Sequence, residues 1–543
     1  MNDRTTTADA RFPPIANPLT SAGLSPFAGM DAATLLVSRA QLHGDRAFLI
    51  WAPFDAPERT WTYAGFLEDV TRLAGGLQAR GIGPGDRVLV HLENCPETLL
   101  IRFACAWIGA IAVISNAMAS GPELRDMIDS TGARAAVTQP RMAGLLAAHA
   151  PLTVEWIAVT FSDAGETPST RDLPERTSRF KALLGQPAAQ RTPDPAQPAL
   201  ILFTTGTTGQ AKAVLWTHEN LLFASSMGAR QQGFHAGDVA QVFLPLFHVV
   251  GFSWAFLPVL WVGGTALLQP RFSASRFWQL AQRHHATISP QLPFTLGALN
   301  AHPLPEKHDF RFWIANRQMP EEQQRFGIPA IVSAWGMTET VSQPIIGVPG
   351  EGDLQAPSMG RPSPGYAIRI VAEGGADVAP GETGELLVGG IRGRSLFREY
   401  FRNPQANAEA FTPDGFFRTG DRVRQLDDGS ILFVERIKDV MKVGGEGVSS
   451  LEIEAVIRRV KGVRDVAVVP RADPLRGEVP VAFVEPDPAG TPDEDTRVAI
   501  LELCRRELAR FKLPQEIRFL DDLPRTGFGK IAKGKLRAMV GSA

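Results

Sequence analysis

Glycine, threonine and lysine residues are concentrated in Phe203 to Val214 (FTTGTTGQAKAV), directly after an apolar run. Glycines let the backbone turn tightly and approach a ligand, while hydroxyl and ammonium groups donate hydrogen bonds to phosphate oxygens. The segment is not a Walker A loop, because Ala213 follows Lys212 where a magnesium-binding hydroxyl is required. An ordinary polar loop with a solvated lysine is the alternative. The candidate phosphate-binding residues are Thr204, Thr205, Gly206, Thr207, Thr208 and Lys212.

A second segment, Ser333 to Thr340 (SAWGMTET), combines an aromatic residue with an acidic one. Trp335 offers a flat face on which adenine could stack, and Glu339 offers an oxygen ligand for magnesium. The structural alternative is that Thr338 and Glu339 cap a helix while Trp335 fills the core.

Further charged residues occur near the end of the chain. Asp421 lies in a glycine turn (FRTGDR) and could accept hydrogen bonds from both hydroxyls of a ribose. Arg436, Lys438 and Lys442 form a basic ladder, and Lys530 lies between glycine turns in LPRTGFGKIAKGKL. Taken singly, these residues would be interpreted as a surface turn and solvated charges.

The elements that must position these residues change in character along the chain. Up to about Gly360, strand-like runs such as Asp86 to Leu92 alternate with helical patterns such as Pro96 to Gly109, which predicts βαβ units and a largely parallel sheet. Glycine-punctuated runs then predict antiparallel hairpins. From Lys438 a compact α+β unit follows. We therefore expect an α/β multidomain protein, with helix-covered mixed sheets and an antiparallel β portion in residues 1–437 and a small α+β domain in residues 438–543.

Composition sets limits on the partners. The 543 residues are 44% hydrophobic, which excludes a mainly disordered chain. The chain has 55 basic and 57 acidic residues, and its net charge of −2 gives no reason to expect nucleic acid or an acidic membrane as a partner. The three cysteines, Cys95, Cys105 and Cys504, form no disulfide or metal pattern. The two longest apolar stretches are interrupted by charged residues, prolines or glycines. These features predict a soluble, cytoplasmic protein without an integral membrane segment.

Together and in this order, the motifs resemble those of the adenylate-forming superfamily of acyl-CoA synthetases, adenylation domains and luciferases, from about Thr60 to Leu536. The resemblance implies ATP binding by the threonine-rich loop, by Trp335, Gly336, Met337 and Thr338, and by Asp421 and Arg436. It implies a magnesium ion near Thr204 and Glu339 and a catalytic lysine at Lys530. It also implies that the C-terminal domain is mobile: it swings about a hinge at Lys438 and presents the face that includes Lys442 for the second of two half-reactions.

The acid-binding site is predicted by the segment Pro245 to Trp254 (PLFHVVGFSW), which resembles the family's channel wall. His248 occupies the position that often gates the acyl site, although a core histidine is the alternative. Val249 and Phe252 suggest an apolar acyl or aryl group. No carboxylate occurs between Val239 and Pro270, which argues against an amino-acid substrate.

The stretch WIANRQMP, which contains Asn316, replaces a glycine-rich segment that normally touches adenine and acid. With GRSLFREYFRNPQA it looks closest to the carnitine/crotonobetaine-CoA ligase branch. The expected function is an ATP-dependent carboxylic acid–CoA ligase that forms an acyl-AMP, then a thioester with CoA. No carrier-protein module follows, which favours CoA as acceptor. The alternatives are an enzyme that loads a carrier protein and a catalytically dead nucleotide-binding regulator. A homodimer is possible in similar enzymes.

Overall fold

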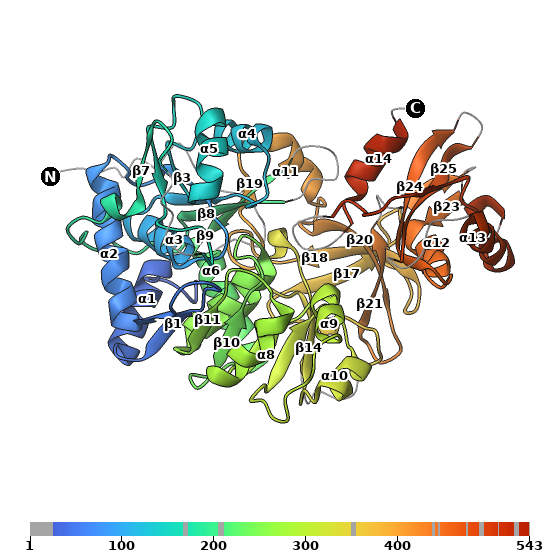
Figure 1. The fold of residues 1–543 in the computed structure, drawn as a ribbon, viewed down its shortest axis with the longest axis horizontal. Coiled ribbons are helices and arrows are strands. Elements are labelled where there is room, and N and C mark those ends of the chain that lie inside the picture. The colour runs from blue at the N-terminus through green and yellow to red at the C-terminus, as the bar shows by residue number, and fades with distance from the viewer. Residues whose placement is uncertain are drawn as a thin grey trace.

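The computed structural model describes residues 25–166, 172–204, 211–348, 354–436, 440–443, 446–473, 476–487, 494–508, 510–525 and 531–541. Two large mixed sheets and a smaller antiparallel sheet make up the chain as far as residue 436, and a separate α+β unit follows (Figure 1). The expected fold class is confirmed.

The first large sheet has eight strands in the order β19-β9-β8-β4-β3-β5-β6-β7, and its strands from β8 to β7 are parallel. Its strands are β3 (Arg87–His91), β4 (Ile111–Ile114), β5 (Ala135–Thr138), β6 (Trp156–Val159), β7 (Thr177–Arg179), β8 (Pro198–Phe203), β9 (Ala213–Thr217) and β19 (Glu399–Tyr400). The associated helices are α2 (Tyr63–Ala79), α3 (Pro96–Ile108), α4 (Gly121–Thr131) and α5 (Pro140–His149). The parallel strands that the alternation predicts are therefore present.

The second large sheet has nine strands, ordered β16-β15-β14-β13-β12-β10-β11-β1-β2. Its strands are β1 (Ala47–Trp51), β2 (Arg59–Thr62), β10 (Val239–Val242), β11 (Thr265–Leu268), β12 (Ile288–Pro290), β13 (Phe312–Ala315), β14 (Ile331–Trp335), β15 (Ile345–Gly347) and β16 (Arg361–Pro362). The helices of this region are α1 (Ala32–His43), α6 (His218–Gln232), α7 (Leu257–Val262), α8 (Ala274–Arg283), α9 (Pro293–Leu299) and α10 (Pro320–Phe326).

Helix α3 illustrates how sequence places an element in the core. Pro96 begins the helix, where its missing N–H costs nothing, and Gly109 ends it with a φ of 75°. Every residue between them except Glu97 is buried. The largest apolar cluster includes residues of α1, α3 and α6 together with strands of both large sheets. Helix α3 is therefore a core helix, and no described helix has the length and apolar character needed to cross a membrane.

The third sheet is antiparallel, as the glycine-punctuated pattern predicts, in the order β17-β18-β20-β21. Its strands are β17 (Ala367–Val371), β18 (Thr383–Gly389), β20 (Phe417–Gln425) and β21 (Ile431–Arg436), and helix α11 (Pro404–Ala410) precedes β20. Glu385 pairs with Arg422 but Leu387 pairs with Arg418, so β20 contains a bulge between these pairs. Gly420 lies in it with a φ of 70°, a conformation that glycine adopts without strain.

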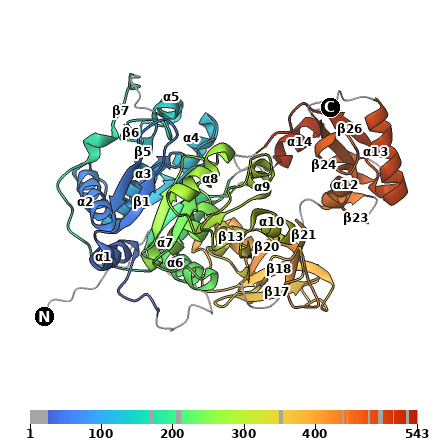
Figure 2. The same ribbon diagram turned by 60° about the horizontal axis from the view of Figure 1, so that its bottom comes forward.

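The C-terminal unit has its own sheet, ordered β23-β22-β25-β24 with β26 beside β25, and lies to one side of the larger part in both views (Figures 1 and 2). Its elements are β22 (Val440–Val443), β23 (Glu446–Ser449), α12 (Ser450–Ile457), β24 (Val463–Asp473), β25 (Gly477–Pro486), α13 (Glu494–Glu507), β26 (Glu516–Phe519) and α14 (Lys533–Gly541). Its two apolar clusters contain only residues of this unit. The boundary at residues 437 and 438 lies outside the described residues and stays a prediction.

Candidate active site

The predicted phosphate loop joins the antiparallel strands β8 and β9 of the eight-stranded sheet. The backbone N–H of Thr204 donates to the carbonyl of Lys212 at 3.1 Å, and Phe203 pairs with Ala213, so the two ends of the loop are fixed side by side. Thr205, Gly206, Thr207 and Thr208 lie outside the described residues.

The predicted adenine segment, Ser333 to Thr340, starts in the last three residues of β14 and continues beyond the end of this strand. Thr338–Thr340 form one turn of 3-10 helix, which begins after Met337. The indole N–H of Trp216, on β9, donates to the carbonyl of Thr338 at 2.9 Å, and the Tyr366 hydroxyl donates to the carbonyl of Thr340 at 2.6 Å. These bonds join the segment to neighbouring elements, so the structure fixes the position of Glu339.

Glu339 is 3% exposed, and its two carboxylate oxygens differ in environment. The Tyr400 hydroxyl donates to Oε1 at 2.9 Å, whereas Oε2 has no hydrogen-bond partner among the described residues. Burial raises the pKa of Glu339, while the Tyr400 hydrogen bond and the charges of Arg436 and Lys212 oppose the rise. A buried carboxylate oxygen without a partner is poised for a cation.

Lys212 lies beside the same group. Its Nζ is 4.6 Å from the centre of the Tyr400 ring. The register explains the contact, because Tyr400 in β19 pairs with Val214 in β9, two residues beyond Lys212. The end of the phosphate loop, Tyr400 and Glu339 therefore form one connected group drawn from three segments of the chain.

Asp421 lies within strand β20 and is 1% exposed, so the expected glycine turn is wrong as a description of its local structure, and so is the alternative of a surface turn. The strand bulges at Gly420, and this glycine was the source of the turn signal. Asp421 Oδ2 accepts from the indole N–H of Trp335 at 3.0 Å, and Oδ1 lies 2.8 Å from Nε of Arg436, its cross-strand partner. The structure thus brings together three of the predicted nucleotide-binding residues.

The predicted acyl-channel wall also reaches this group. His248 is half-buried, and residues Val250–Phe256 form a π-helix, η3, that leads into α7. The Ser253 hydroxyl donates to the carbonyl of Val341 at 2.5 Å. A Cβ atom on Gly336 would lie 2.5 Å from the carbonyl oxygen of Ser342 and 3.0 Å from Cζ2 of Trp254, so the backbone contact leaves no room for a side chain here. Irregular π-helical turns are frequent at functional sites.

Asn316 is exposed and follows β13. Because Ala315 pairs in parallel with Ser333, Asn316 lies at the same sheet edge as Trp335. Of the predicted residues in the C-terminal unit, Lys438 and Lys530 lie outside the described residues, and only the backbone of Lys442 is described, in β22.

Sequence reasoning missed the tyrosines. The chain has only three tyrosines, and two of them, Tyr366 and Tyr400, donate hydrogen bonds to residues of the Thr338–Thr340 turn. Their rarity was the available signal. No group of three or more histidine, cysteine, aspartate and glutamate side chains in the described part of the chain could hold a metal ion.

Two family models match the chain. The AMP-binding enzyme model matches residues 36–401, and the model of the AMP-binding enzyme C-terminal domain matches residues 452–530. A crotonobetaine/carnitine–CoA ligase from Salmonella paratyphi B is 32% identical over 512 residues, which cover 92% of this chain and 97% of the relative.

Solved structures agree over the same length. ATP-bound MatB from Rhodopseudomonas palustris matches with a TM-score of 0.80 and 26% identity, covering 94% of this chain and 99% of that one. The o-succinylbenzoate CoA synthetase MenE from Bacillus subtilis, in complex with its acyl-adenylate intermediate, matches with a TM-score of 0.79 and 25% identity, covering 94% and 98%.

Proposed function

The chain belongs to the AMP-binding enzyme family, and we propose that it is an AMP-forming ligase that joins a carboxylic acid to coenzyme A with ATP as the energy source. The observation that carries the proposal is the buried Glu339 carboxylate, with one oxygen held by Tyr400, the other without a partner, and Lys212 beside it. Relatives named as CoA ligases and a neighbour bound to an acyl-adenylate support it.

The first half-reaction forms an activated acid. A carboxylate oxygen attacks the α-phosphorus of ATP, the bond to pyrophosphate breaks, and an acyl-AMP results. Two anions must meet in this step, so placed positive charge is needed. Lys212 and Arg436 lie near Glu339 and oppose the rise of its pKa, and Lys530 would act on the α-phosphate.

A magnesium ion fits this group. Magnesium is usually held by one or two carboxylates and by substrate phosphates, and Oε2 of Glu339 is a buried oxygen without a partner. Glu339 and Thr204 would hold it. When bound, magnesium neutralises the charge of the phosphates. Asp421 would accept hydrogen bonds from the ribose, since Trp335 and Arg436 fix the position of its carboxylate.

The second half-reaction transfers the acyl group. The thiol of CoA attacks the carbonyl carbon, AMP leaves, and the thiol proton goes to solvent. We propose that the C-terminal domain turns about Lys438 between the steps, withdrawing Lys530 and presenting the face that includes Lys442. Both apolar clusters of this unit consist only of its own residues and include none from the larger part of the chain, which supports its movement as one body.

The acid is proposed to have an apolar acyl or aryl body. Val249, Phe252 and Trp254 are all buried in the predicted wall, and His248, which precedes them, is half-buried. Crotonobetaine and carnitine, the acids in the names of the Salmonella relatives, are not proposed as substrates. A cationic acid would need a free aromatic face, and one face of Phe252 is already covered by the Arg102 guanidinium, 4.3 Å from the ring centre.

Product analysis tests the function. The enzyme is incubated with ATP, magnesium, CoA and a panel of carboxylic acids, and AMP, pyrophosphate and acyl-CoA are measured by mass spectrometry. Glu339→Gln should lose about 100-fold or more of the rate, the usual effect of removing one preorganised charge. Glu435→Gln is the matched control, since Glu435 is similarly buried at 4% exposed and also has one oxygen without a hydrogen-bond partner among the described residues, while its other oxygen pairs with Arg422. Acyl-AMP without thioester would favour carrier loading, and no product from any acid would contradict the proposal.

A further inference from the structure

A positive charge is buried beside the predicted acyl wall. Arg102 lies in the middle of α3 and is 5% exposed. One of its nitrogens, Nη2, donates to the carbonyl of Leu246 at 2.7 Å, and its guanidinium stacks on Phe252. Nε and Nη1 have no hydrogen-bond partner in the part of the chain that the structure describes. Within the described residues no carboxylate pairs with it.

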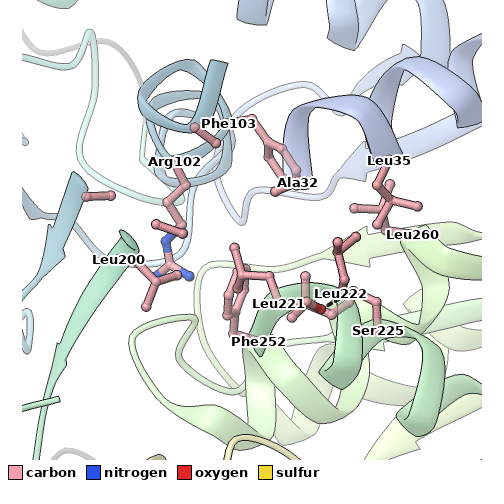
Figure 3. Close-up of a pocket in the computed structure, with 14 residues that line it drawn as sticks. Ala32, Leu35, Arg102, Phe103, Leu200, Leu221, Leu222, Ser225, Phe252 and Leu260 are labelled. Atoms are coloured by element: carbon pink, nitrogen blue, oxygen red, sulfur yellow. Dashed lines mark hydrogen bonds between the residues drawn. The ribbon is translucent and has the colours of Figure 1, made fainter. Parts of the chain in front are cut away.

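Figure 3 shows Arg102 pointing from α3 into a cavity, with the Phe252 ring beside its guanidinium and Leu200 on the other side. The cavity has a volume of about 20 Å³ and lies between α1, α3, α6, η3, α7 and the strands β4 and β8. Its lining is apolar apart from Arg102 and Ser225, and the Ser225 hydroxyl already donates to the carbonyl of Leu221 at 2.7 Å.

Such an arrangement is costly unless something compensates the charge. Burial lowers the pKa of Arg102 only to about 9, so the side chain remains a cation at neutral pH. A water molecule would fit a cavity of this size and could accept the free N–H groups, but it would leave the charge unbalanced. A small anion would satisfy the N–H groups and the charge together.

The cavity also adjoins the residues that flank His248. Arg102 binds the carbonyl of Leu246, two residues before His248, and stacks on Phe252, four residues after it. The N–H of Phe252 donates to the carbonyl of His248 at 3.1 Å. An anionic group here would therefore lie just behind the wall that we propose for the acyl chain.

We propose that Arg102 and this cavity form a binding site for a small anionic group. The group is either the far end of the acid substrate or a free monovalent anion such as chloride. The first source rests on the proposed function and makes Arg102 a specificity-determining residue that favours anionic tails and rejects cationic ones. The second does not depend on it.

Two arms distinguish the sources, each run on wild type, Arg102→Met, Arg102→Lys and Arg80→Met. Methionine keeps the length of the side chain and removes the charge, while lysine keeps the charge. Arg80 is the matched control, because its guanidinium also lies over an aromatic ring, that of Trp156 at 5.9 Å, and donates to a backbone carbonyl, that of Ala182, at 3.2 Å. It is far less buried and does not line the cavity.

The substrate arm compares kcat/KM for adipate, for γ-trimethylammoniobutanoate and for the isostere in which a quaternary carbon replaces the nitrogen. We expect the wild type to disfavour the cationic tail relative to the neutral isostere by about tenfold or more, and to favour adipate. Arg102→Met should lose both preferences, Arg102→Lys should keep most of them, and the control should match the wild type.

The anion arm measures the thermal unfolding midpoint in sodium chloride and in sodium gluconate of equal ionic strength. A higher midpoint in chloride for wild type, Arg102→Lys and Arg80→Met, but not for Arg102→Met, assigns the site to a free anion. This arm needs no substrate, so it still tests the anion site if no acid is turned over. Failure of the proposed function can therefore be distinguished from failure of the anion-site proposal. The proposal is overturned if the wild type shows neither a preference among the acid tails nor a higher unfolding midpoint in chloride. It is also overturned if these effects persist in Arg102→Met.

Discussion

Tyr400→Phe isolates one hydrogen bond of the candidate site. The substitution removes the hydroxyl that donates to Glu339 Oε1 at 2.9 Å and keeps the ring that lies 4.6 Å from Lys212 Nζ. A hydrogen bond to a charged group contributes about 1.5–3 kcal/mol. If the bond holds the carboxylate in position for catalysis, kcat/KM for acyl-AMP formation should fall about 10- to 150-fold.

The same change should alter the pH dependence. Burial raises the pKa of Glu339, and the Tyr400 hydrogen bond is the strongest of the interactions that lower it. Without the hydroxyl the pKa rises further, so the protonated, inactive carboxyl persists to higher pH. The acid limb of the pH–rate profile should therefore move to higher pH in the variant.

Acid-dependent exchange of pyrophosphate into ATP, measured across the pH range, is the assay, because it reports the first half-reaction alone. Tyr366→Phe is the control. Tyr366 donates at 2.6 Å to the carbonyl of Thr340 in the same turn and, among the described residues, to no carboxylate. It should lower the unfolding free energy by about 1–3 kcal/mol and leave the acid limb in place. A Tyr400→Phe enzyme with a wild-type rate and acid limb would show that Glu339 does not act through this bond.

Four further substitutions test other parts of the site. Lys530→Ala should nearly abolish pyrophosphate exchange while leaving the unfolding midpoint unchanged; exchange at the wild-type rate would contradict its catalytic role. Lys438→Pro should spare acyl-AMP formation and impair thioester formation, and equal loss of both steps in single-turnover assays would exclude a hinge there. Asp421→Asn should raise KM for ATP about tenfold, since a charged partner of the ribose and of Arg436 is lost; an unchanged KM would remove Asp421 from the nucleotide site. Arg102→Met should raise the unfolding free energy by about 1–4 kcal/mol in the absence of bound anion. Folding lowers the Arg102 pKa to about 9, so the charge destabilises the folded state fully below that pH and progressively less above it. The stability that Arg102→Met gains in denaturant unfolding should therefore shrink above pH 9, and a gain that grew there would contradict this explanation.

Local patterns predicted the elements well. Strand β3 lies within the run Asp86 to Leu92 that predicted it, and Gly109 ends α3 as its position after an apolar helix indicates. Asp421 shows the limit of this reasoning. A glycine beside it indicates a turn, yet the strand continues through a bulge, because pairing with β18 and β21 decides the outcome.

Contacts between distant segments were beyond the reach of the sequence. The motif order indicated that Glu339 and Lys212 act together, but nothing local indicated that Tyr400 would lie between them; the antiparallel pairing of β19 with β9 does so. The charge of Arg102 was visible in the sequence as an interruption of an apolar stretch. Its lack of a counter-ion became visible only when the surrounding elements were placed.

Labelling the carboxyl group of an accepted acid with oxygen-18 shows which bonds form and break in the reaction. If the carboxylate attacks the α-phosphorus and CoA then attacks the carbonyl carbon, the bond between that carbon and the bridging oxygen breaks. One labelled oxygen therefore leaves with AMP, bound to its phosphorus. Mass spectrometry should therefore find AMP with one oxygen-18 per turnover, formed together with acyl-CoA and unlabelled pyrophosphate. Unlabelled AMP, or label in inorganic phosphate beside ADP, would contradict an acyl-AMP mechanism for this protein.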